Sequence, residues 1–123
     1  NRPQGSHLLA AQGADVIVGP RSTELATYDK WRPVWVANAL TTGCYVCSVN
    51  RPSPEEGVLI GGSSIAVAPN GEVLVESCDA ITLFTARQST IQQSRIDYPG
   101  YLPCRSSLYA KCWDEIKERN DEL

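Results

Sequence analysis

The side chains that could do chemistry in this sequence are one histidine, five cysteines and a pair of serines that follows two glycines. A histidine acts as a base when a serine or cysteine lies within its reach, but His7 has no evident partner of that kind, so we interpret it as a surface residue. Ser63 and Ser64 lack the G-x-S-x-G turn that exposes a hydrolase nucleophile. Cys44-x-x-Cys47 has the spacing of redox centres and zinc sites.

The pair Cys44 and Cys47 falls within a predicted strand, where residues three apart point to opposite faces and cannot bind one ion. We therefore favour buried apolar thiols over a redox or zinc site. The odd number of cysteines, without the spacing of a secreted disulfide framework, predicts free thiols. The sequence also lacks a P-loop, a dinucleotide-binding motif and a cluster of metal ligands. We expect no cofactor and no metal.

Hydrophobic periodicity and turn residues indicate the elements that must position these side chains. They predict helices over residues 3–12, 31–42, 87–95 and 106–119, and strands over 14–19, 44–50, 63–68, 72–76 and 80–86. Helices and strands alternate first and strands cluster later, which favours an α/β or layered α+β fold with five strands. We expect residues 1–123 to form a single domain or part of one.

Local signals sharpen three of these elements. In the first helix Leu8, Leu9 and Ala11 are predicted to point inward, and Gly13 ends it. Residues 21–30 are predicted to form a polar loop, and the second helix to start near Pro33. Its Trp31, Trp35 and Asn38 share one face, which we assign to core packing rather than to a ligand site. Asn70-Gly71 predicts a tight hairpin between two strands.

Four short motifs occur in a fixed order. They are Gly13-Ala14-Asp15-Val16-Ile17, Val49-Asn50-Arg51, Gly61-Gly62-Ser63-Ser64-Ile65 and Pro69-Asn70-Gly71. Each motif alone is weak, but the four together in this order are specific. The sequence resembles the C-terminal half of the nitrilase, or carbon-nitrogen hydrolase, superfamily.

This resemblance implies half of an α-β-β-α four-layer sandwich and a hydrolase of non-peptide C–N bonds. Family members use a glutamate base, a lysine and a cysteine nucleophile, which all lie upstream of the matched region. Pro3-Gln4 looks like the family's Pro-Glu just after the nucleophile, so we expect a piece of a longer protein, with the cysteine before Asn1. We assign no catalytic residue to this chain and expect it to be inactive alone.

The resemblance places one loop, Pro20, Arg21, Ser22 and Thr23, beside the substrate. Arg21 could pair with a substrate carboxylate in a bidentate manner, or it could be a solvated loop arginine. Asn50, Gly61 and Ser63 match family positions and are expected to set loop geometry. The chain departs from the family at Gln4, at His7 and at Ala86-Arg87, near the rim of the family's active site.

Charge and hydropathy restrict the partners. The net charge is −3, with 11 basic and 14 acidic residues mixed along the chain, which argues against nucleic acid and anionic membranes. No apolar run approaches the roughly 18 residues that span a bilayer, and we expect a cytoplasmic protein. A small-molecule substrate is expected only when the N-terminal half of the fold is supplied. A non-catalytic binding or assembly partner that retains the half-sandwich is the alternative.

Half of a two-sheet sandwich leaves one face of its sheet uncovered. We predict that this face carries Val16, Val18, Tyr45, Cys47 and Ile65. Because large exposed apolar patches are rare on soluble monomers, we expect a homo-oligomer, with a two-fold dimer as the simplest form. The contact would run sheet to sheet, or through the helices and the C-terminal segment.

Overall fold

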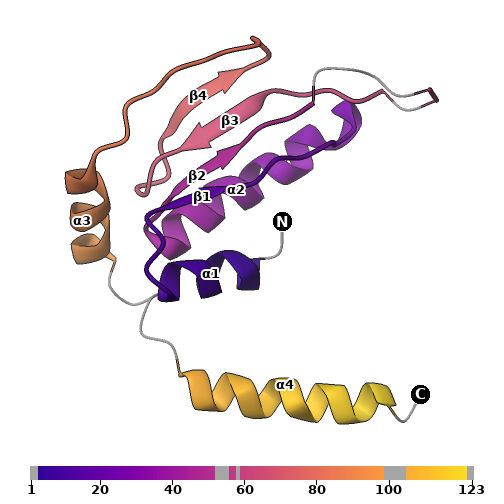
Figure 1. The fold of residues 1–123 in the computed structure, drawn as a ribbon, viewed down its shortest axis with the longest axis vertical. Coiled ribbons are helices and arrows are strands. Elements are labelled where there is room, and N and C mark those ends of the chain that lie inside the picture. Colours follow the sequence, from indigo (N-terminus) through magenta and orange to yellow (C-terminus); the bar gives the residue numbers. More distant parts are fainter. Residues whose placement is uncertain (1–2, 52–55, 58, 99–104, 122–123) are drawn as a thin grey trace.

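The computed structural model describes residues 3–51, 56–57, 59–98 and 105–121. The order of elements is α1 (Pro3–Ala11), β1 (Val16–Val18), the 3-10 helix η1 (Leu25–Thr27), α2 (Tyr28–Thr42), β2 (Tyr45–Ser48), β3 (Ser64–Val67), β4 (Val73–Ser77), α3 (Gln88–Asp97) and α4 (Ser106–Asp121). The strands form one sheet in the order β1-β2-β3-β4. In Figure 1, α2 runs along one face of this sheet, and α4 lies apart from it. No helix among the described residues is long and apolar enough to cross a membrane.

The first two strands are parallel, and the later pairs are antiparallel. A parallel pair requires a crossover connection, which α2 supplies between β1 and β2. The helix ends as predicted at Gly43, whose φ of 62° is left-handed and whose N–H donates to the Ala39 carbonyl. The hairpin at Asn70-Gly71 is also present, with Gly71 at φ 84° and the Ala68 N–H bonded to Glu72 O.

The main core lies between α2 and the sheet. Trp35 and Ala39 of α2 pack with Val46, Ile65 and Val67, all of them buried. These strand residues share one face of the sheet. Val46 pairs with Val67, and Ile65 lies two residues before Val67 in the same strand, so its side chain points to the same side. Asn38 is buried and Trp31 packs against the cluster, which confirms that this face of the helix serves the core.

The opposite face of the sheet is covered only in part. Tyr45 packs there against Ala68 of the hairpin and Ile91 of α3. Val16 and Val18 are exposed, and Cys47 is half-buried. The register puts Val16 and Val18 beside Tyr45 and Cys47, so these four residues share a face as predicted.

Ile65 was wrongly assigned to that open face. It pairs with Ser48, which points away from Cys47, and it is buried in the α2 cluster. The error has a plain physical reason. The two-residue period within a strand is local, but which face of β3 continues which face of β2 depends on the pairing register.

Three further predictions about the elements were wrong. Residues 80–86, the fifth predicted strand, form no strand, because the described chain offers their backbone no hydrogen-bonding ladder. The second helix starts at Tyr28 rather than near Pro33, so Pro33 lies inside it. Pro33 has no N–H to donate to the carbonyl of Asp29, four residues earlier, but Asp29 is exposed and water can bind there. In α1 only Ala10 is buried, and Leu8 and Leu9 are exposed.

The remaining helices follow the predicted ranges closely, with less burial than expected. The apolar residues Leu108, Cys112, Trp113 and Ile116 of α4 are exposed. By contrast α3 buries Ile91 and Ser94, and the Ser94 hydroxyl donates to Pro69 O at 2.9 Å. Much of the predicted loop over 51–57 and of the irregular segment over 96–103 lies outside the described residues.

Candidate functional site

The loop that follows β1 lies beside the segment that follows β2, at the carboxyl ends of the two parallel strands. Pairing continues past the strands in an isolated bridge between Arg21 and Asn50. The Arg21 N–H donates to Val49 O at 2.9 Å, and the Arg51 N–H donates to Arg21 O at 3.2 Å. In open α/β sheets this end of parallel strands is where ligands bind. All four predicted substrate-binding residues, 20–23, lie here.

Asn50 joins this loop to the chain before β3. Its Oδ1 accepts the Thr23 N–H at 3.1 Å, and its Nδ2 donates to the carbonyls of Gly61 and, at 3.3 Å, Gly62. The Gly61 N–H in turn donates to Thr23 O at 3.1 Å. Gly62 has φ +86°, and a Cβ there would lie 2.7 Å from the Tyr28 ring. The prediction that Asn50 and Gly61 set loop geometry agrees with these contacts.

The Arg21 side chain turns inward from the same loop. Its Nε donates to Ser48 Oγ at 3.0 Å, Nη1 to Thr23 Oγ1 at 2.6 Å, and Nη2 to the Ser63 carbonyl. The guanidinium carbon lies 4.3 Å from the centroid of the Trp35 ring and 5.3 Å from that of Tyr28. Arg21 therefore links β2, β3 and α2, and it is not the solvated arginine that was one of the alternatives.

Burial lowers the pKa of the Arg21 guanidinium, and the neighbouring Tyr28 raises this pKa by a smaller amount. An arginine stays charged even so, and its planar face is suited to stacking on aromatic rings. The hydrogen bonds and the rings together compensate the desolvated charge. The first role of this side chain is thus to hold the loop in place.

The four loop residues differ in exposure. Pro20 and Ser22 are exposed, whereas Arg21 and Thr23 are half-buried and bonded within the chain. A hollow of about 290 Å³ adjoins the loop, lined by Glu24, Leu25, Ala26, Gly57 and Leu59. Substrate contact by residues 20–23 stays a prediction. If a ligand binds here, the exposed Pro20 and Ser22 meet it first.

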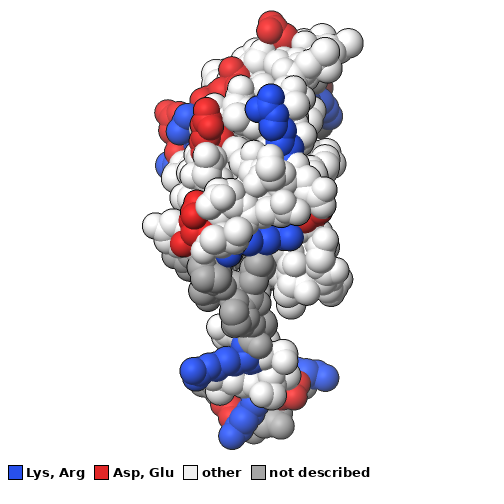
Figure 2. Space-filling view, turned by 90° about the vertical axis from the view of Figure 1, so that its left-hand side faces the viewer, with Lys and Arg blue, Asp and Glu red and all other residues white. Residues whose placement is uncertain are grey.

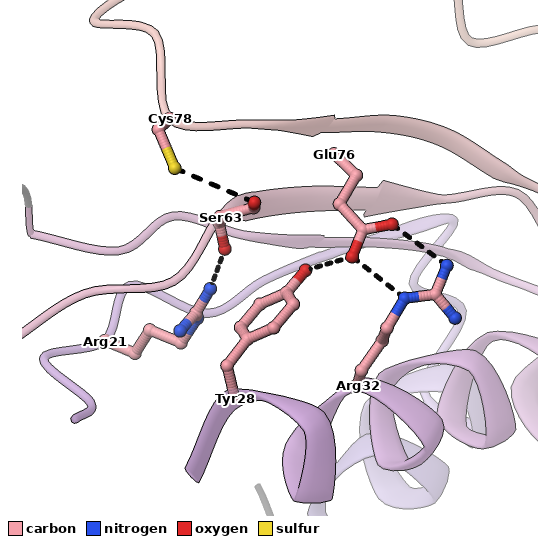
Figure 3. A network of polar contacts seen from close by, with 6 residues as sticks. All are labelled: Arg21, Tyr28, Arg32, Ser63, Glu76 and Cys78. Atoms are coloured by element: carbon pink, nitrogen blue, oxygen red, sulfur yellow. Dashed lines mark hydrogen bonds and ion pairs between the residues drawn. The ribbon is translucent and has the colours of Figure 1, made fainter. Parts of the chain in front are cut away.

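A second polar network lies next to Arg21 and was missed in the sequence (Figure 3). The Tyr28 hydroxyl donates to Glu76 Oε1 at 2.6 Å. Arg32 donates from Nε to Oε1 at 2.8 Å and from Nη2 to Oε2 at 2.9 Å. The hydrogen bonds from Arg32 and then from Tyr28 lower the pKa of Glu76. Burial, reinforced by the bond to Glu76, raises the pKa of Tyr28. The network fastens the start of α2 to the edge strand β4.

One local signal could have suggested this network. Tyr28 and Arg32 stand four residues apart and so share a helix face. Their carboxylate partner is 48 residues from Tyr28, and no sequence spacing indicates it.

The cysteine pair provides no reactive centre. Cys44 is fully buried, with its thiol 3.1 Å from the Ala14 carbonyl. Burial raises the pKa of the Cys47 thiol, which keeps it protonated and weakly nucleophilic. Both are free thiols, as predicted. Within the described residues, no three His, Cys, Asp or Glu side chains come together as a metal site requires. His7 is half-buried on α1.

Sequence comparison identifies the family. The sequence model of the family described as carbon-nitrogen hydrolase matches residues 1–95. The chain belongs to the carbon-nitrogen hydrolase family. This confirms the resemblance drawn from the four motifs. No relative was found among proteins of curated function.

Solved structures of this family and its superfamily share the fold. The carbon-nitrogen hydrolase from Helicobacter pylori G27 matches with a TM-score of 0.74 at 18% identity, over 91% of this chain and 45% of that chain. Nit3 of Saccharomyces cerevisiae, in branch 10 of the nitrilase superfamily, matches with a TM-score of 0.71 at 21% identity, over 85% of this chain and 40% of that chain. A mutant of the amidase from Nesterenkonia sp. AN1, in complex with butyramide, matches with a TM-score of 0.52 at 24% identity, over 62% of this chain and 29% of that chain.

At these identities the likeness shows the fold alone. The chain spans less than half the length of each of these three proteins. The mixed α/β structure therefore matches part of a nitrilase-like fold, as the motifs predicted.

Replacing Arg21 by lysine tests whether this side chain holds the loop. One ammonium cannot reach Ser48, Thr23 and Ser63 together, and it loses the stacking on the rings. We expect Arg21→Lys to lower the free energy of unfolding by about 2–4 kcal/mol in urea titrations. The exposed Arg87→Lys is the matched control, with an expected change within about 0.5 kcal/mol. Equal stabilities of the two variants would contradict the assignment.

Glu76 predicts a specific pH dependence. Its folded pKa is below the ordinary value of 4.5, so its contribution to stability is present above that value and is lost as pH falls through the folded pKa. Between about pH 5 and pH 3, we expect wild-type stability to fall by about 0.5–1 kcal/mol more than that of Glu76→Gln, a small effect because the ion pair is partly exposed. Urea titrations across this range measure it. Glu72→Gln on the same hairpin should track the wild type; parallel curves for all three proteins would rule out the effect.

Proposed function

We propose that this chain forms the part of a carbon-nitrogen hydrolase that walls the substrate pocket, in an enzyme that acts on non-peptide C–N bonds of amides, nitriles or carbamoyl groups. The single observation that carries this proposal is the rigid loop at residues 20–23. It lies at the carboxyl ends of the parallel strands and is fixed by Arg21 and Asn50. Family membership supplies the reaction class.

A wall of this kind must be rigid, because catalysis depends on holding a substrate within a fraction of an ångström of its reactive geometry. The buried contacts of Arg21 and Asn50 provide that rigidity, and the exposed Pro20 and Ser22 are left to face a ligand. A short, uncharged loop surface suits a small neutral amide. Butyramide, the amide bound to the Nesterenkonia amidase, is a suitable probe.

We propose that the chain does not turn over substrate by itself. In the family a thiolate attacks the carbon, a carboxylate moves protons and an ammonium holds the developing negative charge. Cys44 is fully buried, and the thiol of Cys47 is kept protonated by its surroundings. Neither is a nucleophile of the kind this reaction needs.

A non-catalytic binding or assembly role is the second candidate. The open sheet face with Val16 and Val18 favours it, because such a surface needs a cover. On the face drawn in Figure 2, acidic and basic side chains are interspersed, so this face has no patch of a single charge of the kind that binds nucleic acid or an anionic membrane. The free thiols Cys44, Cys47, Cys78 and Cys112 support a reducing, cytoplasmic location.

The cover that we propose is a second copy of this chain. Burial of apolar surface contributes about 25 cal/mol per Å², so covering a few hundred Å² is comparable to the whole stability of a domain. In a two-fold dimer the same surface of each chain contacts the other, so no unpaired contact surface is left to add further chains.

No turnover is expected from the 123-residue chain alone, and butyramide is expected to bind at its loop only when the N-terminal half of the fold is supplied. With that half present, butyramide should shift the ¹⁵N–¹H signals of Ser22 and Thr23, whereas those of Asn70 and Gly71 in the distant hairpin should not shift. Incubation of the chain alone with amides, nitriles and carbamoyl amino acids should release no ammonia. Unshifted loop signals would remove the binding role, and turnover that survives purification but disappears on replacing Cys44 or Cys47 would remove the proposed inactivity.

Sedimentation equilibrium at micromolar concentration tests the dimer. We expect a species of twice the 13.4 kDa chain mass, with an unfolding midpoint that rises with protein concentration. A single folded species of 13.4 kDa, with an unfolding midpoint independent of concentration, would show that the chain needs no second copy.

A further inference from the structure

The Tyr28 ring lies between the candidate loop and a carboxylate on β4. The guanidinium carbon of Arg21 is 5.3 Å from the centroid of this ring. The backbone of Gly62 lies against the same ring, since a Cβ there would come within 2.7 Å of it. Figure 3 shows the other end of Tyr28, where the hydroxyl reaches Glu76. One side chain thus contacts both the loop and the edge strand.

Both contacts of the ring belong to the network that fixes the loop. Arg21 is itself a loop residue, and its guanidinium donates to Thr23 Oγ1 at 2.6 Å. The Gly62 carbonyl accepts from Asn50 Nδ2 at 3.3 Å, and Asn50 Oδ1 accepts the Thr23 N–H. A shift of the ring would therefore disturb both side chains that fix the loop, Arg21 directly and Asn50 through Gly62.

The carboxylate that holds the hydroxyl is itself fixed. Tyr28 is the first residue of α2, and its hydroxyl donates to Glu76 Oε1 at 2.6 Å. Arg32 pairs with both oxygens of that carboxylate, at 2.8 and 2.9 Å, and so sets its orientation. Glu76 lies opposite Ile65 in the pairing of β3 with β4, and Ile65 is buried in the α2 cluster.

The position of the ring depends on this acceptor. Tyr28 is only 9% exposed, so its hydroxyl needs a partner within the protein. Without Glu76, the ring would have to turn to bring the hydroxyl to water. Its contacts with Arg21 and Gly62 would then change.

We propose that Glu76 is a positioning residue for the loop at 20–23 and that it acts through the Tyr28 ring. Neither side chain needs to touch a ligand for this role. The inference deepens the proposed function and rests on it only for one consequence, which is that a loosened loop binds substrate less tightly. The order of the loop itself is measured without any substrate.

Hydrogen exchange of single backbone amides measures the order of the loop. The Thr23 N–H, which donates to Asn50, reports on the loop. The Gly43 N–H, which donates to Ala39 O at the far end of α2, reports on the fold as a whole. We expect Glu76→Ala to lower the protection of Thr23 by about threefold or more relative to that of Gly43, because it leaves a buried hydroxyl without its acceptor.

Two further variants show whether the effect passes through the ring. Adding Tyr28→Phe to Glu76→Ala should restore most of the Thr23 protection, because no hydroxyl is left without an acceptor. Glu76→Gln keeps an acceptor oxygen and should stay within about twofold of the wild type. The matched control is Glu72→Ala on the same hairpin, which is exposed and should leave the ratio of Thr23 to Gly43 protection unchanged.

Three results of the exchange measurement would overturn the inference. They are equal losses of protection at Thr23 and Gly43, no loss at Thr23, and a loss that Tyr28→Phe does not reverse. Equal losses would mean that Glu76 contributes only to overall stability. A loss that persists in the double variant would mean that Glu76 acts on the loop by a route other than the ring.

Butyramide binding separates this inference from the proposed function. With the N-terminal half of the fold supplied, Glu76→Ala should weaken butyramide binding by about threefold or more, and the added Tyr28→Phe should restore it. Unchanged affinity beside a loosened loop would overturn the positioning role. A wild-type protein that binds no butyramide would remove the proposed pocket wall, whereas the coupling between Glu76 and the loop is decided by the exchange rates alone.

Discussion

The structure depends on one half-buried cation. Arg21 follows β1 and lies against the rings of Trp35 and Tyr28, and its guanidinium donates to Thr23 of its own loop, to Ser48 of β2 and to Ser63 before β3. A desolvated charge is tolerated only when its surroundings compensate it, so β2, the chain before β3 and α2 must all be in place for Arg21 to be there. This makes the position of the loop a property of the whole fold.

The second constraint is a sheet with one finished face. On the α2 side, Trp35, Ala39 and Val67 are almost fully buried. On the other side Tyr45 is covered by α3, but Val16 and Val18 remain open. A sheet buried on one side is stable only if the other side is polar or covered, and here it is apolar. The open face and segment 80–86 are thus apolar parts that the described chain itself leaves uncovered.

Family membership and these features are mutually consistent. The chain covers less than half of the family structures it matches. Its described residues include a parallel strand pair, a crossover helix and a loop fixed by Arg21 and Asn50.

Much of the architecture was predictable from short-range patterns. The glycine that ends α2, the Asn70-Gly71 hairpin, the inward face with Trp35 and the family motifs all follow from residues close together in the chain, because backbone preference and turn geometry are local. Segment 80–86 shows the limit of such patterns. Its composition predicted a strand, but a strand exists only where another backbone pairs with it, and the described chain supplies none.

The sequence by itself therefore determined the family, most of the helices and turns, and the position of the candidate loop. Only the tertiary structure decided that Ile65 faces α2, that Arg21 points inward and that Glu76 joins Tyr28 to Arg32. The reason is physical. The contacts of Arg21 with Ser63 and of Tyr28 with Glu76 join residues 42 and 48 positions apart, and such contacts form only when strand register and helix packing bring distant side chains to one place.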